Sequence, residues 1–392
     1  MLKVKSLLSW KFVTFNNEVS GIYLHIPFCK QACSYCDFYF VTRTSEREHF
    51  VQRLIQEIES YQDTAYTQEL VETIYFGGGT PSLLEPRQIH DIIDAIRDVF
   101  EVDAREITFE MNPDDVNAPF LRDLKAIGIN RASMGVQSFQ PDLLNFMNRA
   151  HSSDEAVHCL ELLSKSEFEA FTVDLIYGNP EQTIEQLDRD IDQLLAFDPP
   201  HVSAYSLTIE PKTRLGKLVE LGRLEPPEDD TVATHFELIN NRFDDYGIER
   251  YEVSNYARRG SEAVHNSRYW EHKNYLGFGP GANSFWWKQK AVRWENKRNL
   301  REYLRHSSNC DEEQLTLQQL AEERIMMGLR TRKGVGREEL IHKYDYELSD
   351  KQKSYLQKRE DENKVLLDDR IRLTDAGIQV ADAIVLDLVT LY

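Results

Sequence analysis

Residues 21–36 read GIYLHIPFCKQACSYC, an apolar run that leads directly into three closely spaced cysteines. The run Gly21–Ile26 is short, apolar and bounded by glycine and proline, which is typical of a buried strand. Cys29, Cys33 and Cys36 follow it with the spacing C-x3-C-x2-C. The order of these two features predicts a strand whose carboxyl end carries a loop of potential metal ligands.

Five further apolar runs of this kind follow, with amphipathic helical stretches between them. The strand-like runs are Thr73–Phe76, Glu106–Glu110, Arg131–Val136, Phe171–Tyr177 and Val202–Leu207. The helical stretches lie near Glu46–Tyr61, Pro86–Phe100, Ala118–Ile127, Ser153–Ser164 and Thr183–Ala196. This alternation predicts an α/β fold with parallel strands joined by right-handed crossovers. Six units indicate a partial (β/α)6 barrel, and a doubly wound sheet is the alternative.

The sequence pattern changes after residue 210 and again near residue 311. A proline-rich break at Leu224–Glu228 precedes a helical stretch, Thr231–Tyr246, and a region rich in glycine and aromatic residues that we interpret as loop. The later helices are predicted at Leu315–Leu329, Arg337–Tyr344, Ser349–Arg359 and Asp375–Leu388, with a hairpin of Val365–Leu367 and Arg370–Leu373. We therefore expect a lead-in (1–20), the barrel (21–210), an extension (211–310) and a C-terminal helical module that resembles a winged helix (311–392).

Composition limits the classes of function. The 392 residues carry a formal net charge of −20, which argues against binding to nucleic acid. The C-terminal module is also acidic, so we expect it to pack or to dock a partner rather than to bind DNA.

No run approaches the roughly 18 apolar residues of a membrane span. The basic lead-in, with Lys3, Lys5 and Lys11, lacks the features of a secretory signal. We expect a cytoplasmic protein that is not embedded in a membrane, and an organellar transit signal is the alternative.

The cysteine pattern favours a metal site over disulfides. Three of the five cysteines lie within eight residues, unlike an extracellular disulfide framework. Three thiolates can hold three corners of a [4Fe–4S] cube and leave one iron open to a small ligand. Structural zinc has four ligands, usually in two-plus-two spacing, and His25 can complete such a set as the alternative. Cys159 is expected in the core, and no other cysteine stands at ligand spacing from Cys310 in the sequence.

Glycine and polar residues follow the ends of later strands, where a barrel of this kind places its site. The run Gly77–Pro81 follows the second strand and matches neither a Walker loop nor a dinucleotide fingerprint. We interpret its glycines as room for a ligand to approach the backbone. Glu110 and Gln137 end the third and fourth strands, Arg149 follows, and Asp174 lies within the fifth strand. Together these residues predict a ring of donors and acceptors for ribose and carboxylate groups.

The cysteine spacing, with an aromatic residue before the last cysteine, resembles the radical S-adenosylmethionine (SAM) superfamily. The resemblance implies a [4Fe–4S] cluster on Cys29, Cys33 and Cys36, with SAM chelating the open iron. It is closer still to the oxygen-independent coproporphyrinogen III oxidase family, over roughly residues 20–390. The runs that carry it are Tyr23–Cys29, Tyr75–Ser82, Gly135–Phe139 and Asp174–Gly178. The SAM contacts that it implies are Tyr23, Tyr35, Gly78, Gly79, Thr80, Glu110, Gln137, Arg149 and Asp174.

Two features separate the branches of this family, which are true oxidases (HemN) and haem chaperones (HemW). True oxidases carry a further cysteine two residues past the last cluster ligand, where this chain has Phe38. The run His265–Trp270 (HNSRYW) matches the H-N-x-x-Y-W haem-binding motif of the chaperone branch. The resemblance implies that His265 is an axial ligand of haem iron, with Arg268 as a partner for a propionate. The alternative for His265 is a packed core histidine, and His272 is a weaker second candidate.

The resemblance to the chaperone branch predicts that the chain binds a [4Fe–4S] cluster, SAM and haem. It further predicts delivery of haem to acceptor haemoproteins such as respiratory enzymes. The alternative is an oxygen-independent coproporphyrinogen III dehydrogenase, which decarboxylates propionates oxidatively to give protoporphyrinogen IX. Phe38 and the motif at His265–Trp270 argue against that alternative.

Overall fold

The computed structural model describes residues 19–166, 168–305 and 310–391, so the basic part of the predicted lead-in lies outside the described residues. The described chain forms a 12-stranded sheet in the order β12-β11-β10-β9-β1-β2-β3-β4-β5-β6-β8-β7. Strands β1 to β6 pair in parallel with their neighbours. They are β1 (Val19–Ile26), β2 (Leu70–Gly78), β3 (Val102–Met111), β4 (Arg131–Gln137), β5 (Ala170–Tyr177) and β6 (His201–Ser206). All six predicted strands, and their parallel pairing in a partial barrel, are confirmed.

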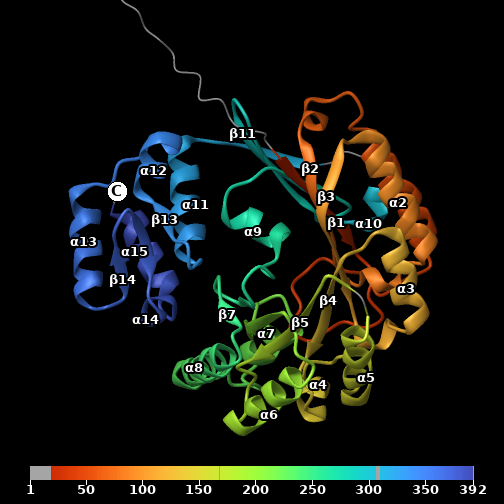
Figure 1. Ribbon diagram of the computed structural model, residues 1–392, viewed down its shortest axis with the longest axis horizontal. Coiled ribbons are helices and arrows are strands. Elements are labelled where there is room, and N and C mark those ends of the chain that lie inside the picture. The colour runs from red at the N-terminus through yellow and green to blue at the C-terminus, as the bar shows by residue number, and fades with distance from the viewer. Residues whose placement is uncertain (1–18, 167, 306–309, 392) are drawn as a thin grey trace, which may run out of the picture.

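Helices cover the outer face of this sheet (Figure 1). They are α1 (Arg47–Glu59), α2 (Pro86–Val99), α3 (Ala118–Ile127), α5 (Ser153–Ser164) and α6 (Ile184–Leu195). Each buries one apolar face, as α2 does with four isoleucines at helical spacing. Cys159 on α5 is 1% exposed and is packed beside Met134, which confirms its predicted place in the core. A helix that the sequence analysis missed, α4 (Pro141–Phe146), is too short to show a helical period.

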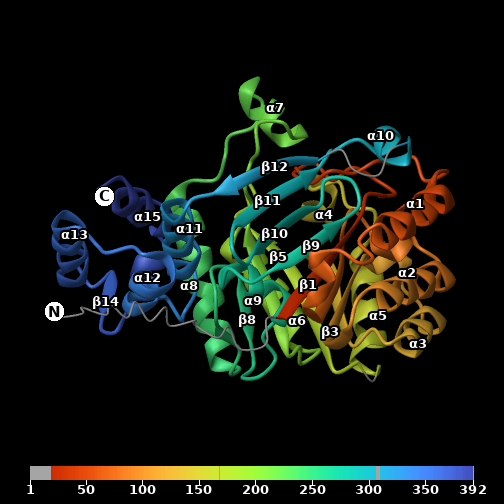
Figure 2. The same cartoon turned by 90° about the horizontal axis from the view of Figure 1, so that it is seen from above.

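Residues 211–310 do not end in a loop region, so that prediction was wrong. Strands β9 (Tyr275–Phe278), β10 (Asn283–Trp287) and β11 (Ala291–Asn296) extend one edge of the sheet, with β9 parallel to β1. At the other edge, β8 (Asn255–Ala257) pairs antiparallel to β6 and carries β7 (Glu249–Arg250). These strands are short and contain glycine and polar residues, which hid their period. The helices of this region are α7 (Arg214–Glu220), which stands away from the sheet (Figure 2), α8 (Asp229–Asp245), α9 (Val264–Trp270) and α10 (Leu300–Arg305).

The C-terminal module follows β12 (Cys310–Leu315) and has its own small sheet, in the order β13-β15-β14. Its predicted helices and hairpin are confirmed, except that the final helix is two helices interrupted near Val380 (φ −122°). The elements are α11 (Leu317–Leu329), β13 (Val335–Gly336), α12 (Arg337–Tyr344), α13 (Asp350–Asp361), β14 (Val365–Leu367), β15 (Arg370–Leu373), α14 (Asp375–Ile378) and α15 (Ala381–Thr390).

The module joins the two edges of the open sheet. It follows β12 at one edge, and at the other the backbone N–H of Arg332 donates to the carbonyl of Tyr251 at 2.9 Å. Thr331 also forms an isolated β-bridge with Glu252. Helix α9 lies on the concave side of the sheet (Figure 1), packed against β2, β3 and α11. The fold therefore places α9 inside a nearly closed ring of elements. Within the described ranges, no helix is long and apolar enough to cross a membrane.

Candidate cofactor-binding site

The loop with the three cysteines leaves β1 and is held by its neighbours. The carbonyl of Val41 accepts the N–H of Cys29 at 3.0 Å, and the carbonyl of Met147 accepts the N–H of Ser34 at 3.0 Å. Lys30 pairs with Asp114 at 2.8 Å and with Asp115. The three cysteine side chains remain half-buried on this loop. Their backbone is thus fixed without closing the thiols off from a ligand.

A cavity of about 490 Å³, the cysteine chamber, contains Cys29, Cys33 and Cys36 in its lining. The ends of β2, β3, β4 and β5 complete its wall, because the carboxyl ends of parallel strands meet at one edge of a sheet. The structure therefore brings together eight of the nine residues proposed to contact SAM. They are Tyr35, Gly78, Gly79, Thr80, Glu110, Gln137, Arg149 and Asp174.

Arg149 is the centre of the polar contacts in the cysteine chamber. Its Nη1 lies 3.3 Å from the Sγ of Cys33, and its Nη2 donates to Asn112 Oδ1 at 2.7 Å and to the carbonyl of Gly135 at 2.8 Å. Asn112 in turn donates from Nδ2 to the hydroxyl of Thr80 at 3.1 Å. The sequence analysis missed Asn112. The signal that could have identified it is its position directly after β3, where the other polar residues of the site also follow strand ends.

Burial sets the charge of the chamber. It raises the pKa of Glu110 to about 7 and that of Asp174 to about 6. The hydroxyl of Tyr75 donates to Glu110 Oε1 at 2.7 Å, which opposes part of the rise. Burial also raises the pKa of the thiols of Cys29 and Cys36, to about 11 and about 12. Negative charge is therefore disfavoured in the chamber until a cation or metal compensates it.

Two buried polar atoms of the chamber lack a partner among the described residues. They are Oε1 of Gln137 and Nε of Arg149. Gln137 also has a left-handed backbone (φ 68°) at the end of β4, a conformation that is uncommon for residues other than glycine and often marks functional sites. An unpartnered acceptor and donor beside three thiols suit a ligand that carries both amino and carboxylate groups.

The glycines at the end of β2 are required by close contacts within the protein. A Cβ on Gly78, whose φ is 105°, would meet the ring of His25 at 2.6 Å. A Cβ on Gly79 would meet the carbonyl oxygen of Phe28 at 2.7 Å. The close approach is thus between this turn and β1 with its cysteine loop, whereas the sequence analysis ascribed it to a ligand. Gly78 and Gly79 still line the chamber.

His25 does not complete a zinc site. Its Nδ1 lies 3.1 Å from the hydroxyl of Tyr23, and its Nε2 lies 2.8 Å from the carbonyl of Tyr39. In the described parts of the chain, no three Cys, His, Asp or Glu side chains converge as ligands of a single metal ion. Thiols spread along one loop suit the separate corners of an iron–sulfur cube better than the tetrahedron of zinc.

A second cavity, the aromatic chamber, adjoins the first and measures about 570 Å³. The ninth proposed SAM contact, Tyr23, lines this chamber and not the cysteine chamber. Tyr269 and Asn266, from the motif on α9, line it as well. The two chambers share the wall residues Asp37, Phe38, Gly78 and Glu110.

His265 of the motif is 1% exposed and lies behind the wall of the aromatic chamber. Its Nδ1 lies 2.9 Å from the hydroxyl of Thr73, and its Nε2 lies 2.8 Å from the hydroxyl of Tyr269. Burial lowers the pKa of His265 to about 3, so the imidazole is neutral at physiological pH. Both nitrogens are thus engaged within the protein, and Tyr269 is the partner that borders a cavity.

A buried carboxylate fixes the start of α9. Glu106 accepts the backbone N–H of His265 at 2.7 Å and that of Val264 at 2.9 Å. Arg131 lies 3.7 Å from the same carboxylate, and both side chains are about 5% exposed. Thr73 and Glu106 belong to predicted strands, but nothing in their local pattern linked them to a helix far along the chain.

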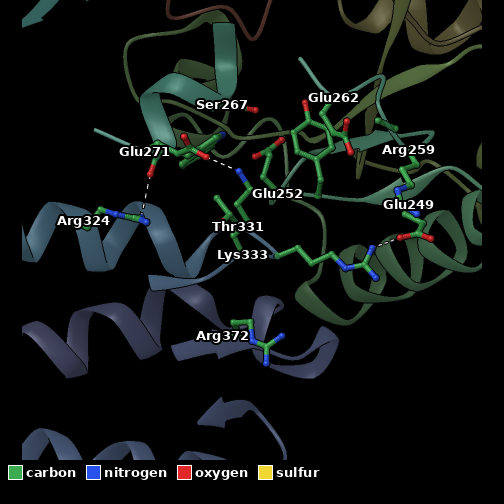
Figure 3. Close-up of a pocket in the computed structure, with 14 residues that line it drawn as sticks. Glu249, Glu252, Arg259, Glu262, Ser267, Glu271, Arg324, Thr331, Lys333 and Arg372 are labelled. Atoms are coloured by element: carbon green, nitrogen blue, oxygen red, sulfur yellow. Dashed lines mark hydrogen bonds and ion pairs between the residues drawn. The ribbon is translucent and has the colours of Figure 1, made fainter. Parts of the chain in front are cut away.

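The other residues of the motif, Ser267, Arg268 and Trp270, do not line the aromatic chamber. Arg268, the predicted propionate partner, is buried against Glu72 and the carbonyl of Val19. Trp270 and Ser267 border a third cavity, of about 740 Å³, between α9 and the C-terminal module. Figure 3 shows Arg324 and Lys333 of the C-terminal module, which donate to the carbonyl of Trp270 and to the carboxylate of Glu271 at the end of α9. His272 instead links sheet and module, with Nδ1 3.1 Å from the hydroxyl of Tyr344.

Comparisons with known proteins agree with this architecture. Residues 23–194 match the radical SAM superfamily, and residues 315–380 match the HemN C-terminal domain. The heme chaperone HemW of Bacillus subtilis is 35% identical over 336 residues, which are 83% of this chain and 87% of that protein. The heme chaperone HemW of Lactococcus lactis is 33% identical over 372 residues, or 93% and 95% of the two chains.

A solved structure shows the same fold. Coproporphyrinogen III oxidase (HemN) from Escherichia coli, a radical SAM enzyme, superposes with a TM-score of 0.79. The match has 20% sequence identity and covers 96% of this chain and 91% of that one. With the cysteine loop at the mouth of a partial barrel and relatives this similar over most of the length, the chain belongs to the HemW family of the radical SAM superfamily.

Proposed function

We propose that this chain is a haem chaperone that binds a [4Fe–4S] cluster, SAM and one haem, and delivers the haem to acceptor haemoproteins such as respiratory enzymes. The observation that carries the proposal is the place of α9. Its buried imidazole, His265, stands behind an aromatic chamber that adjoins the cysteine chamber. We assign this activity to the cytoplasm, where a reducing thiol pool keeps clustered cysteines available for iron.

The cysteine chamber supports the first two cofactors, which superfamily membership implies. Cys29, Cys33 and Cys36 would hold three irons of the cube. Arg149 Nε and Gln137 Oε1, both unpartnered among the described residues, would receive the carboxylate and amino groups of SAM. When bound, the cluster and SAM supply one-electron chemistry. The protein's own part is to orient the ligand and to shield it with buried walls.

The contacts of His265 support a ligand role for its Nε2. That atom bonds Tyr269, whose side chain borders the aromatic chamber, so a shift of one phenol frees it. Nδ1 keeps its bond to the hydroxyl of Thr73. A partner on the second nitrogen orients a ligating imidazole and raises its basicity.

The test is an anaerobic haem titration of the cluster-reconstituted protein, followed by Soret absorbance, for the wild type, His265→Ala and Tyr269→Phe. We expect saturable, near-stoichiometric binding by the wild type. His265→Ala should weaken it, and Tyr269→Phe, which frees Nε2, should equal or exceed the wild type. Equal binding by wild type and His265→Ala would refute the ligand assignment. No saturable binding by the wild type would refute the chaperone and favour oxidative decarboxylation of coproporphyrinogen III, to be assayed directly.

A further inference from the structure

Phe38 lies where the two chambers meet and has no cover there. Its side chain is 71% exposed, the highest value among the large apolar residues that the structure describes. It lines the cysteine chamber and the aromatic chamber at once. An aromatic ring left in water forgoes the favourable free energy of burial. Its exposure at the mouth of two cavities therefore points to a ligand that covers it.

The exposure of Phe38 is not the result of a loose loop. The next residue, Tyr39, accepts a hydrogen bond from the ring of His25 at its carbonyl (2.8 Å) and one from the N–H of Leu300 at its hydroxyl (2.6 Å). The backbone N–H of Val41 donates a hydrogen bond to the carbonyl of Pro27 at 2.7 Å. The backbone thus presents the ring of Phe38 in a fixed position.

Four of the tyrosines that line the aromatic chamber form a continuous series of rings with His265, which lies directly behind its wall. Tyr23 and Tyr75 have centroids 6.0 Å apart, Tyr75 and His265 5.1 Å, His265 and Tyr269 5.2 Å, and Tyr269 and Tyr275 4.7 Å. Such a surface suits a ligand with an extended flat face rather than a sugar or an aliphatic chain.

One permanent cation borders this surface. Arg298 is the single Arg or Lys among the described residues that line the aromatic chamber. Its Nε donates to Glu295 at 2.6 Å. Its two Nη groups have no hydrogen-bond partner among the described residues, so they can receive an anionic group of the ligand. A flat ligand with a carboxylate on its edge satisfies both features.

We propose that Phe38 is the contact surface for the face of a tetrapyrrole held in the aromatic chamber, and that Arg298 pairs with one of its carboxylates. The inference rests on the proposed haem-binding function and adds two residues to it, outside the motif on α9. Phe38 also lines the cysteine chamber. In this proposal its ring therefore covers the side of the macrocycle that is nearer to the cysteine loop.

The first test is a haem titration of Phe38→Ala and Phe38→Tyr. Loss of the ring should weaken haem binding about tenfold, and tyrosine should restore it. Leu221→Ala is the matched control, because Leu221 is 64% exposed at the end of α7 and lines neither chamber. The iron content of the cluster, measured before haem is added, should stay at the wild-type level in all three variants. Wild-type affinity in Phe38→Ala, or a loss of iron that accompanies its weaker binding, would overturn the proposal.

The second test separates the carboxylate contact from the ring contact. Arg298→Gln should bind haem about tenfold more weakly and should bind haem dimethyl ester, which lacks free carboxylates, as the wild type does. Equal effects on both ligands would overturn the assignment of Arg298. A wild type that binds no haem overturns the proposed function itself. Wild-type binding that is insensitive to the Phe38 and Arg298 substitutions overturns this inference alone.

Discussion

The cysteine loop and helix α9 border adjoining chambers, yet the fold holds them by different means. The loop is fixed by backbone hydrogen bonds and by Lys30 at the surface, and its thiols stay half-buried. Helix α9 is fixed by side chains of β2 and β3, and His265 is 1% exposed. The loop can therefore take up a metal cluster without rearrangement of the sheet, whereas His265 must exchange a hydrogen bond before it binds anything.

The largest effect should come from the loop. Cys29→Ala removes one of three thiolates, and three are the fewest that leave a single iron open. We expect loss of the cluster, seen as loss of bound iron and sulfide and of the broad brown absorbance after anaerobic reconstitution. Cys159→Ala, a change at a core cysteine that does not line the chamber, should keep both. Full iron retention in Cys29→Ala would show that the cysteine loop does not hold the cluster through this thiolate.

The second effect concerns the anchor of α9. Glu106→Ala removes the carboxylate that pairs with the buried guanidinium of Arg131 and frees two N–H groups of the helix. Losing one partner of a buried pair lowers the free energy of unfolding by about 3 to 5 kcal/mol. Urea unfolding measures this loss, with Asp123→Ala on the exposed side of α3 as control. A change no larger than that of the control would show that α9 does not depend on this carboxylate.

A smaller effect tests the orientation of His265. Thr73→Val keeps the shape of the side chain but removes the hydroxyl bonded to Nδ1. Haem affinity in the Soret titration should fall about tenfold, the usual effect of losing such a partner. Thr108→Val on β3 is the control, because Thr108 is buried but its hydroxyl has no partner among the described residues. If both variants bind haem alike, Thr73 does not orient the imidazole.

The smallest effect is a pH dependence at the border of the chambers. Burial raises the pKa of Glu110 to about 7, above its ordinary value near 4.5, so the folded protein holds a proton between these pH values that the unfolded chain has lost. The contribution of this proton to stability is present at low pH and is lost as pH rises towards and through 7.

Glu110→Gln keeps the bond to Tyr75 but removes the titration. The melting temperature of the cluster-free variant should change less between pH 5 and pH 8 than that of the wild type, by roughly a few degrees. Glu101→Gln, at an exposed position before β3, should follow the wild type. A wild-type slope in Glu110→Gln would mean that Glu110 is charged throughout this range.

Much of the barrel and of the cysteine chamber follows from local sequence. The six central strands are short apolar runs bounded by turn residues, and the helices between them have a period of 3.6 residues, so both signals depend only on neighbouring residues. The three cysteines lie within eight residues of one another, and the polar residues that end parallel strands necessarily meet at one edge. For this reason eight of nine proposed SAM contacts lie together, while the division into four parts stays a prediction.

Only the tertiary structure decided what surrounds α9 and what closes the barrel. The bonds of His265 to Thr73 and Glu106 span more than 150 residues, and the pairing of β9 with β1 joins segments that are still further apart in the sequence. The close contacts that require glycine at the end of β2, with His25 and with the carbonyl of Phe28, are likewise invisible along the chain. Such contacts depend on how elements pack, and packing is set by the shape of the whole assembly rather than by the period of any one segment.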